Sequence, residues 1–426
     1  MNILLLGSGG RECALAWKIS QSPLCNQLYI APGNGGTGSY GINVAIDVNN
    51  FEAIKAFCLK EKVDMVLPGS EDPLVQGIYD FFQKDEQIKH IQVAGPSAAG
   101  ARLEGSKSFA KAFMARHQIP TAAYHEFDET NFDKGLDYLK TCDTPIVLKA
   151  DGLAAGKGVV ITEDRPEAAK VFTEMIREGS FGKAGRQVVI ESFLSGIECS
   201  VFVLTDGKNY VLLPDAKDYK RIGEGDTGPN TGGMGAVSPV PFVDAAFMQK
   251  IKERIVEPTI KGLQEEQLTY QGFIFFGLIK VKDDPYVIEY NCRMGDPETE
   301  VVIPRLENDL PELLVKMKAG QLNDVTIRHK KEAATTVMMV SDGYPGSYEK
   351  GKAITGFESC KDVLLFHAGT KTDSNGSLKT NGGRVLAATA FGQDIQDALK
   401  KSYAAAESIS FAGKYYRRDI GFEFSK

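Results

Sequence analysis

The chain has 426 residues, which corresponds to about three domains at roughly 150 residues each. Its 49 Lys and Arg against 56 Asp and Glu give a net charge of −7, and the basic residues are scattered along the sequence. This balance argues against a nucleic-acid partner. No apolar run approaches the ~20 residues that span a bilayer, and no basic leader precedes the first apolar run, so we expect a cytoplasmic protein without membrane association.

The seven cysteines include no C-x-x-C pair, and the five histidines include no H-x-x-x-H pair. We therefore expect neither a disulfide framework nor a zinc site, so any metal must be held by oxygen. The sequence does not define the oligomeric state, and we expect a monomer or a weak homo-oligomer.

Residues 1–104 alternate short apolar runs with helical patterns, which predicts a Rossmann-like parallel α/β domain. Residues 105–325 contain longer strands separated by glycine-rich loops, which predicts an α+β domain with a mobile lid at about 121–194. Residues 326–426 predict a small C-terminal α+β domain. The apolar runs of the first domain are Ile3–Leu6, Leu28–Ile30, Val44–Ile46, Met65–Leu67 and Ile91–Ala94.

The turn at Gly7–Glu12 follows the first predicted strand and opens a helix, where exposed N–H groups and the helix dipole favour an anion. It differs from the dinucleotide fingerprint because Glu12 stands where the third glycine belongs, and the second strand runs into Ala31–Asn34 without an acidic residue. We interpret it as a site for a single phosphate, with a purely structural turn as the alternative.

A strand at Leu148–Ala150 runs into a loop of small residues, and a second strand follows directly from Gly158. Small residues let backbone N–H groups close on phosphate oxygens, and strand alternation places Lys149 beside the loop. This predicts a phosphate clamp with a lid that includes Gly156 and Lys157; a flexible hairpin is the alternative.

Two further segments carry polar residues beside predicted strands. The strand–turn–strand at 189–200 can present backbone groups to a purine, with Glu198 free for ribose hydroxyls, although an ordinary hairpin explains it equally well. The segment 214–221 leads into a long glycine-rich loop at 223–235, and such loops in compact domains are usually functional or disordered.

The strand that ends in Arg293 has two different faces. At the strand period of two, Glu289, Asn291 and Arg293 share one face, while Ile288, Tyr290 and Cys292 share the core face. A carboxylate and an amide oxygen can hold Mg²⁺, whose remaining ligands come from substrate phosphates and water. Arg293 can brace a phosphoryl group or a carboxylate. A structural salt bridge explains Glu289 and Arg293 without function, but it leaves Asn291 unexplained.

Together these segments resemble the ATP-grasp superfamily and, within it, the phosphoribosylamine–glycine ligase family. The resemblance extends over nearly the whole chain. It is carried by 7–12, 31–37, 68–71, 104–107, 148–152, 191–198, 214–221, 231–235, 288–299, 367–370, 382–385 and 416–421.

The resemblance implies that ATP, glycine and 5-phosphoribosylamine give glycinamide ribonucleotide, ADP and phosphate through a glycyl phosphate. It also implies that loops 151–158 and 223–235 close to exclude water. The implied catalytic residues are Lys149, Asp215, Lys217 and Arg293. The implied ATP site contains Lys107, Lys149, Gly156, Lys157, Gly158, Glu191, Phe193, Leu194 and Glu198. The implied Mg²⁺ or Mn²⁺ ligands are Glu289 and Asn291. The implied substrate site contains Gly9, Gly10, Arg11, Asp215, Lys217, Arg293, Gly295, Asp296 and Pro297.

One residue departs from the family pattern, because Cys13 stands where the family usually has histidine. Any proton transfer attributed to that histidine is in doubt here, although we expect activity to survive. Three alternatives stay open: another ligase or carboxylase of the same superfamily that uses bicarbonate or formate, a nicotinamide-dependent oxidoreductase built on Gly7–Gly9, and a non-catalytic ATP-binding regulator.

Overall fold

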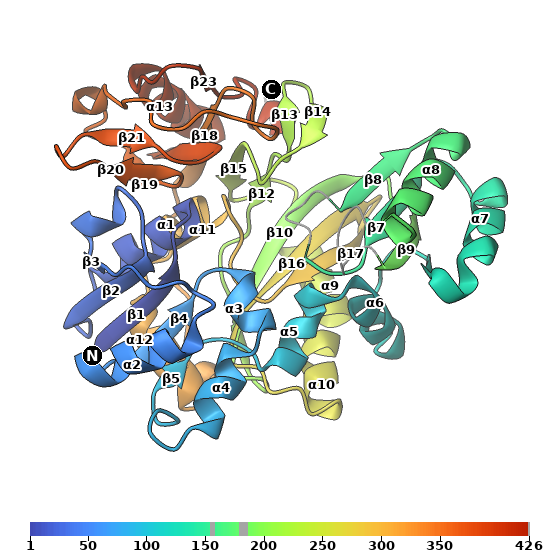
Figure 1. Cartoon of the computed structure of the whole chain (residues 1–426), viewed down its shortest axis with the longest axis horizontal. Helices are drawn as coiled ribbons and strands as arrows, with labels where there is room; N and C mark the ends of the chain where they lie inside the picture. Colours follow the sequence, from blue (N-terminus) through green and yellow to red (C-terminus); the bar gives the residue numbers. More distant parts are fainter. Residues whose placement is uncertain (154–157, 179–185, 425–426) are drawn as a thin grey trace.

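The computed structural model describes residues 1–153, 158–178 and 186–424. Figure 1 shows an N-terminal α/β unit, a central α+β unit and a C-terminal α+β unit, with one lobe of the central unit projecting to the side. The predicted fold class is confirmed: a parallel N-terminal sheet, a central antiparallel sheet with a second small sheet, and a C-terminal sheet.

The N-terminal sheet is parallel throughout and has the order β3-β2-β1-β4-β5. Parallel neighbours need crossover connections, which the helices supply. The strands are β1 (Asn2–Gly7), β2 (Gln27–Pro32), β3 (Ile42–Asn43), β4 (Met65–Pro68) and β5 (Gln92–Val93), and the helices are α1 (Gly10–Ile19), α2 (Phe51–Glu61), α3 (Glu71–Val75), α4 (Ile78–Lys84) and α5 (Ala98–Gly105).

The strand predicted at Val44–Ile46 is wrong in position. The strand lies earlier, at Ile42–Asn43, and Val44 makes one further hydrogen bond to the carbonyl of Ile30. The N–H of Ile46 then donates to the carbonyl of Val44 at 2.7 Å, which turns the chain away from the sheet.

The central unit contains two antiparallel sheets. The larger has the order β11-β10-β16-β17, and the smaller has the order β6-β9-β7-β8 and forms the projecting lobe (Figure 1). The strands of the larger sheet are β10 (Ile197–Thr205), β11 (Tyr210–Leu212), β16 (Gly272–Val281) and β17 (Asp284–Asn291), with α6 (Lys107–Arg116), α9 (Ala245–Ile251) and α10 (Glu257–Glu265) nearby.

The projecting lobe has its own core, in which Phe127, Phe132 and Phe172 pack together. Its strands are β6 (Tyr124–Asp128), β7 (Ile146–Ala150), β8 (Val159–Thr162) and β9 (Gln187–Ser192), and its helices are α7 (Phe132–Thr141) and α8 (Arg165–Ile176). A separate core is compatible with a lobe that moves as one body, and the mobile lid stays a prediction.

The C-terminal sheet has the order β12-β15-β18-β22-β19, with β23 beside β18. Its first two strands come from the region between the central strands, so the sheet ties distant parts of the chain together. The elements are β12 (Lys217–Asp218), β15 (Gly235–Ser238), β18 (Ala333–Ser341), β19 (Leu364–His367), β22 (Arg384–Gly392), β23 (Lys414–Tyr415) and α13 (Ile395–Ser408); two hairpins, β13 (Arg221–Gly223) with β14 (Thr227–Asn230) and β20 (Thr370–Thr372) with β21 (Leu378–Thr380), flank it.

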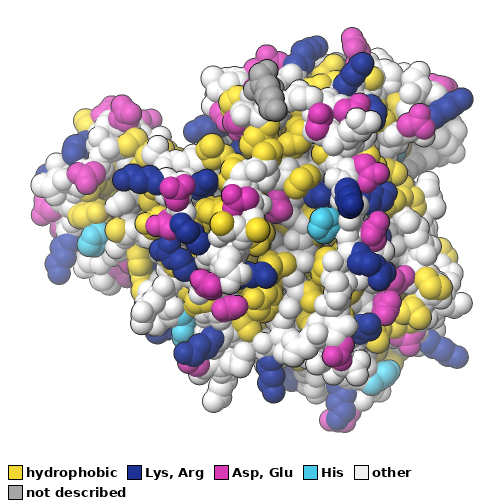
Figure 2. All heavy atoms as spheres, turned by 180° about the vertical axis from the view of Figure 1, so that it is seen from behind, with side chains coloured by type: hydrophobic (Ala, Val, Ile, Leu, Met, Phe, Trp, Pro, Cys, Tyr) yellow, Lys and Arg dark blue, Asp and Glu magenta, His cyan; other side chains and the backbone are white. Residues whose placement is uncertain are grey.

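Helix α11 (Thr299–Arg305) lies between the N-terminal and C-terminal units, because it packs against α1, β15 and β18. Helix α12 (Leu310–Lys318) follows it and also contacts α1. Figure 2 shows side chains of both charges mixed over the rear face, without a continuous basic stripe on that face. Within the described ranges, no helix combines the length and apolarity needed to cross a membrane.

Candidate active site

A cleft of about 790 Å³ lies between the projecting lobe and the larger central sheet. Its walls come from α6, β7, β9, β10, β12 and β17, so segments of the predicted site that are far apart in the sequence meet there. The predicted site residues that line it are Lys107, Lys149, Gly158, Glu191, Phe193, Leu194, Glu198, Lys217, Glu289, Asn291, Arg293, Gly295 and Asp296, joined by Arg11.

Two lysines share one buried carboxylate in this cleft. The Nζ atoms of Lys149 and Lys111 lie 2.9 Å and 3.1 Å from the two oxygens of Glu191, and all three side chains are buried. Burial lowers the pKa of Lys111 to about 8, although Glu191 opposes this effect. The carboxylate of Glu191 therefore orients Lys149. Sequence reasoning missed Lys111, although it lies one helical turn after Lys107.

The predicted phosphate clamp is described only in part. Lys107 donates from Nζ to the carbonyl of Gly152 at 2.9 Å, and Ser106 donates from Oγ to the carboxylate of Asp151. These bonds hold the start of the loop against α6. Burial lowers the pKa of Lys107, which also faces Lys149. Gly156 and Lys157, predicted to bind phosphate, lie outside the described residues.

Strand β17 supplies the predicted metal ligands, but its alternation is broken. Gly277 pairs with Glu289 whereas Leu278 pairs with Val287, so Ile288 is an extra residue in a β-bulge. The prediction that Ile288 faces the core is therefore wrong: it is half-buried and lines the cleft, and Lys149 donates to its carbonyl at 3.4 Å. Tyr290 is buried in the core as predicted.

Glu289 and Asn291 both line the cleft. The described residues contain no group of three or more His, Cys, Asp or Glu placed to hold a metal ion. Two oxygen-bearing side chains fit Mg²⁺ or Mn²⁺ only if a phosphorylated substrate and water complete the coordination. The donor chemistry of Glu289 and Asn291 agrees with that mode of binding.

Two carboxylates hold Arg293 in place. Both belong to segments that carry the family resemblance, but the sequence analysis assigned them no role. Nη2 of Arg293 lies 2.8 Å from Glu104, and its Nε lies 3.2 Å from Glu71. Burial opposes the charge on Arg293, but the two carboxylates raise its pKa. Despite its own burial, the pKa of Glu71 is lowered to about 2 by Arg293 and Arg11. The guanidinium is thus held as a charged, oriented group at the end of the cleft.

The structure separates two residues that were predicted to act together. Lys217 lies in the cleft with its Nζ 2.8 Å from Glu423 and 3.9 Å from the ring centre of Tyr219. Asp215 does not line either described cavity, because its carboxylate accepts a 2.6 Å hydrogen bond from the N–H of Val240. The structure therefore supports Lys217 as a site residue, whereas Asp215 stabilises a turn outside the cleft.

Glu198 is also engaged, because its Oε2 accepts from Nζ of Lys220 at 2.6 Å. Although burial opposes ionisation, Lys220 lowers the pKa of Glu198. Lys220 lies in segment 214–221, which contributes to the family resemblance, but the sequence analysis assigned it no role. A nucleotide that uses Glu198 for its ribose therefore also meets Lys220.

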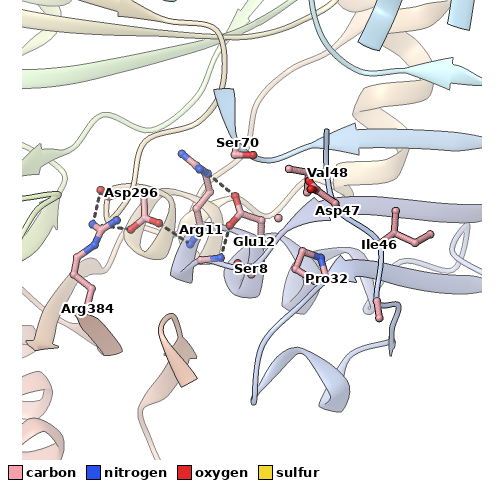
Figure 3. Close-up of a pocket in the computed structure, with 13 residues that line it drawn as sticks. Ser8, Arg11, Glu12, Pro32, Ile46, Asp47, Val48, Ser70, Asp296 and Arg384 are labelled. Carbon is pink, nitrogen blue, oxygen red and sulfur yellow. Dashed lines mark hydrogen bonds and ion pairs between the residues drawn. The ribbon is translucent and has the colours of Figure 1, made fainter. Parts of the chain in front are cut away.

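A second cavity of about 660 Å³ lies over the N-terminal turn of α1 (Figure 3). Gly9 and Arg11 line it, as predicted, whereas Gly10 and Pro297 are not among its lining residues. Two N–H groups of the turn already have acceptors: Gly9 donates to Glu12, and Arg11 donates to Asp296. Gly10 instead packs against α11, where a side chain would collide with Glu300.

The two cavities share three residues. Arg11, Asp296 and Arg384 line both of them, and Arg384 lies 2.9 Å from Oδ1 of Asp296. Figure 3 shows Asp296 between Arg384 and the backbone of Arg11. Arg384 comes from the C-terminal unit. It belongs to segment 382–385, which contributes to the family resemblance, but the sequence analysis assigned it no role.

Cys13 lies away from both cavities. Its side chain is 0% exposed and packs in the core of the C-terminal unit, and its Sγ accepts a 3.3 Å hydrogen bond from the N–H of His367. Burial raises the pKa of the Cys13 thiol to about 12. The residue is therefore a packing residue here, and a role in proton transfer finds no support.

The glycine-rich loop at 223–235, expected to close over the site, is anchored in this structure. Arg417 is fully buried and pairs with Asp226 at 2.6 Å and with Asp419 at 2.8 Å. The N–H of Gly225 also donates to Asp419 at 2.7 Å. These bonds join the β13–β14 hairpin to the C-terminal segment, so we assign any closing motion to the lobe instead of this loop.

A parallel α/β unit, a two-sheet central unit with lysines on one side and an acidic strand on the other, and a small C-terminal unit define an ATP-grasp ligase. Residues 1–104, 105–299 and 334–423 match the N domain, the ATP-grasp (A) domain and the C domain of phosphoribosylglycinamide synthetase. The chain belongs to this family.

Named relatives match the chain over nearly its full length. The chain is 47% identical over 425 residues to a phosphoribosylamine–glycine ligase of Mesorhizobium japonicum, covering 99% of this chain and 98% of the relative. It is 45% identical to the Salmonella typhi enzyme of that name, with the same coverage. A crystal structure of the Thermotoga maritima phosphoribosylamine–glycine ligase matches with a TM-score of 0.85 and 35% identity, covering 98% of this chain and 100% of that one.

More distant structures share the fold alone. A biotin carboxylase from Campylobacter jejuni matches with a TM-score of 0.72 and 16% identity, covering 99% of this chain and 94% of that one.

Proposed function

We propose that this chain joins glycine to 5-phosphoribosylamine, using ATP and releasing ADP and phosphate through a glycyl phosphate intermediate. The observation that carries this proposal is the sharing of Arg11, Asp296 and Arg384 by the two cavities. A two-substrate ligation needs an activated acid and an amine to meet, and two cavities with a common wall provide that meeting point.

ATP fits the larger cleft. All five binding residues line this cleft. Lys107 and Lys149 would bind the phosphates, the backbone of Phe193 and Leu194 at the turn after β9 would bind adenine, and Glu198 would bind the ribose. Because Glu191 is bonded to two lysines, its side chain acts through Lys149 instead of contacting adenine. The lobe that carries Lys149 excludes water, to which an acyl phosphate is sensitive.

Glu289 and Asn291 would hold Mg²⁺ or Mn²⁺, which neutralises the charge of the triphosphate when bound. Arg293 is oriented by Glu71 and Glu104 toward the same space, where it can bind the carboxylate of glycine. Lys217 adds a second fixed cation. These groups bring two anions, a carboxylate and a phosphoryl group, close enough to react.

The amine substrate fits the smaller cavity. Its phosphate would lie against Gly9 and the guanidinium of Arg11, and its amine would point toward the wall that both cavities share. Gly295 and Asp296 border this wall. We further predict a cytoplasmic enzyme that is a monomer or a weak homo-oligomer.

The test is phosphate release with ATP, glycine and freshly generated phosphoribosylamine, each omitted in turn. The proposal expects release only when all three are present. Release that needs bicarbonate or formate in place of glycine would instead support another ligase or carboxylase of the superfamily, and NAD(P)H binding would support an oxidoreductase.

A further inference from the structure

Glu300 is a fully buried acidic side chain without an assigned role. It lies in α11 with 0% exposure, where the N-terminal and C-terminal units meet. Helix α1 presses against it so closely that a Cβ atom at Gly10 would collide with Glu300 Oε1. Glu300 lines neither of the two described cavities, and its carboxyl is enclosed by protein.

The described residues offer neither oxygen of Glu300 a hydrogen-bond donor. Its acidic neighbour is Asp296, because the two carboxyl groups lie against consecutive residues of α1: a Cβ atom at Gly9 would meet Oδ2 of Asp296, and a Cβ atom at Gly10 would meet Oε1 of Glu300. Two neighbouring carboxyl groups can share a hydrogen bond only if one of them carries a proton. An ionised, unpaired carboxylate in this position would face a desolvation penalty that buried charges avoid by neutralising.

The environment decides which of the two carries the proton. Asp296 lies 2.9 Å from Arg384 and accepts from the N–H of Arg11, whereas Glu300 forms no ion pair with any described residue. Burial and then Asp296 raise the pKa of Glu300, while Arg384 and Arg11 keep the pKa of Asp296 low in spite of its burial. The proton therefore belongs to Glu300.

We propose that Glu300 is a neutral carboxylic acid that donates a hydrogen bond to Asp296 and positions it at the wall shared by the two cavities. The carboxylate of Asp296 is then held by three groups: Glu300 from α11, Arg384 from β22 and the backbone of α1. Glu300 itself reaches neither cavity, so it acts through Asp296 as a positioning residue.

The charged and titratable groups around Glu300 come from three sides. Helix α1 contributes Arg11 and Cys13, strand β22 contributes Arg384, and the loop before α11 contributes Asp296. Strands β15 and β18 also pack against α11, but they carry no acidic, basic, tyrosine, histidine or cysteine side chain. Among the acids on the described elements packed against α11, Asp296 raises the pKa of Glu300, and Glu12 is paired with Arg11.

This assignment rests on the proposed function where it concerns substrate binding. A second negative charge beside Asp296 would offset the positive potential of Arg11 and Arg384, on which a phosphate in the smaller cavity depends. A neutral Glu300 leaves that potential intact. It also fixes Asp296, so that the two arginines stay in place when the cavity is empty.

The test compares Glu300→Gln with Glu300→Leu, because both remove the titrating group and only glutamine keeps a donor for Asp296. We expect Glu300→Gln to retain kcat and the KM for phosphoribosylamine within about twofold. We expect Glu300→Leu to raise that KM about tenfold or more with a smaller change in kcat. If both variants keep the normal KM, or if glutamine is as harmful as leucine, the positioning role is wrong.

The protonation state of Glu300 can be tested by measurements that do not depend on enzyme activity. A buried acid that keeps its proton loses stability as pH rises above ~4.3, where the unfolded chain ionises. Glu300→Gln should therefore raise Tm at pH 8, and this gain should shrink toward pH 4. An infrared band of a protonated carboxyl should disappear in the same variant. A Tm gain that does not depend on pH, or no lost band, would overturn the assignment even if the proposed ligase reaction is correct.

Discussion

Nζ of Lys149, on β7, lies 2.9 Å from Oε1 of Glu191, on β9, and the other oxygen of that carboxylate lies 3.1 Å from Lys111 on α6. This triad joins the projecting lobe to the helix that begins the central unit. One carboxylate thus orients two cations in a buried cleft. Removing it leaves two buried lysines that repel each other.

We expect Glu191→Gln to destabilise the protein by about 3 kcal/mol, the lower end for breaking a buried ion pair, and to weaken ATP binding. Lys111→Met should be milder, because Glu191 keeps Lys149 as a partner. The double variant should lose less than the sum of the two, since one of the repelling cations is gone. Chemical denaturation of all four proteins measures this, and strict additivity would show that the three groups do not interact.

The central catalytic prediction concerns Lys149 and Glu289. Lys149→Ala and Glu289→Gln should each lower turnover by about a hundredfold or more, the scale for losing a charged contact made in the transition state. For Glu289→Gln, the Mg²⁺ concentration needed for half-maximal rate should also rise. Lys89→Ala and Glu86→Gln are matched controls from an exposed surface ion pair, and near-normal rates in both cleft variants would refute the site.

Strand alternation predicted much of the site, since Glu289, Asn291 and Arg293 do line the cleft. It failed for Ile288, because the bulge arises from pairing with β16, which one strand's sequence does not encode. Asp215 was placed with Lys217 by the family resemblance and not by alternation; β12 begins only at Lys217, and Asp215 precedes it in a turn.

Contacts between residues that are distant in sequence could not be predicted, for a related reason. Lys111 has the spacing of an ordinary helix residue, and only the fold brings it to Glu191. Arg384 likewise meets Asp296 only after the C-terminal sheet has packed against α1 and α11. Single-sequence patterns report which face a residue occupies, and the pairing of faces depends on the tertiary fold.

Cys13 provides a test of the departure from the family pattern. Because the thiol is buried away from both cavities, Cys13→Ala should leave kcat/KM within about threefold, and its cost should appear in stability, at roughly 1 kcal/mol. Cys13→His should not raise kcat/KM, since the larger ring must displace packed neighbours. A gain above about a hundredfold, worth ~2.7 kcal/mol of transition-state binding, would mean that an imidazole here does reach the reaction.

The half-buried His367 should contribute to acid sensitivity. Burial lowers its pKa to about 4, below the ~6.5 expected in the unfolded chain. Between these values the unfolded state takes up a proton that the folded state does not, so stability falls as pH drops from about 6.5 to 4 by up to ~1.4 kcal/mol per pH unit. His367→Gln should flatten this part of the pH–stability curve, with the surface substitution His90→Gln as control; an unchanged slope would contradict the assignment.

Arg417 tests whether the β13–β14 hairpin is fixed or mobile. Its guanidinium holds Asp226, Asp419 and the carbonyl of Arg221 from a fully buried position. Arg417→Met should remove these bonds and speed hydrogen exchange at 223–230 by about tenfold or more, because local opening there no longer breaks bonds to a guanidinium. The neighbouring Arg418 is exposed, so Arg418→Met should leave exchange unchanged. If hydrogen exchange at 223–230 is the same in the two variants, Arg417 does not hold the hairpin. Closure of the loop at 223–235 over the cleft would then be the simpler explanation of water exclusion.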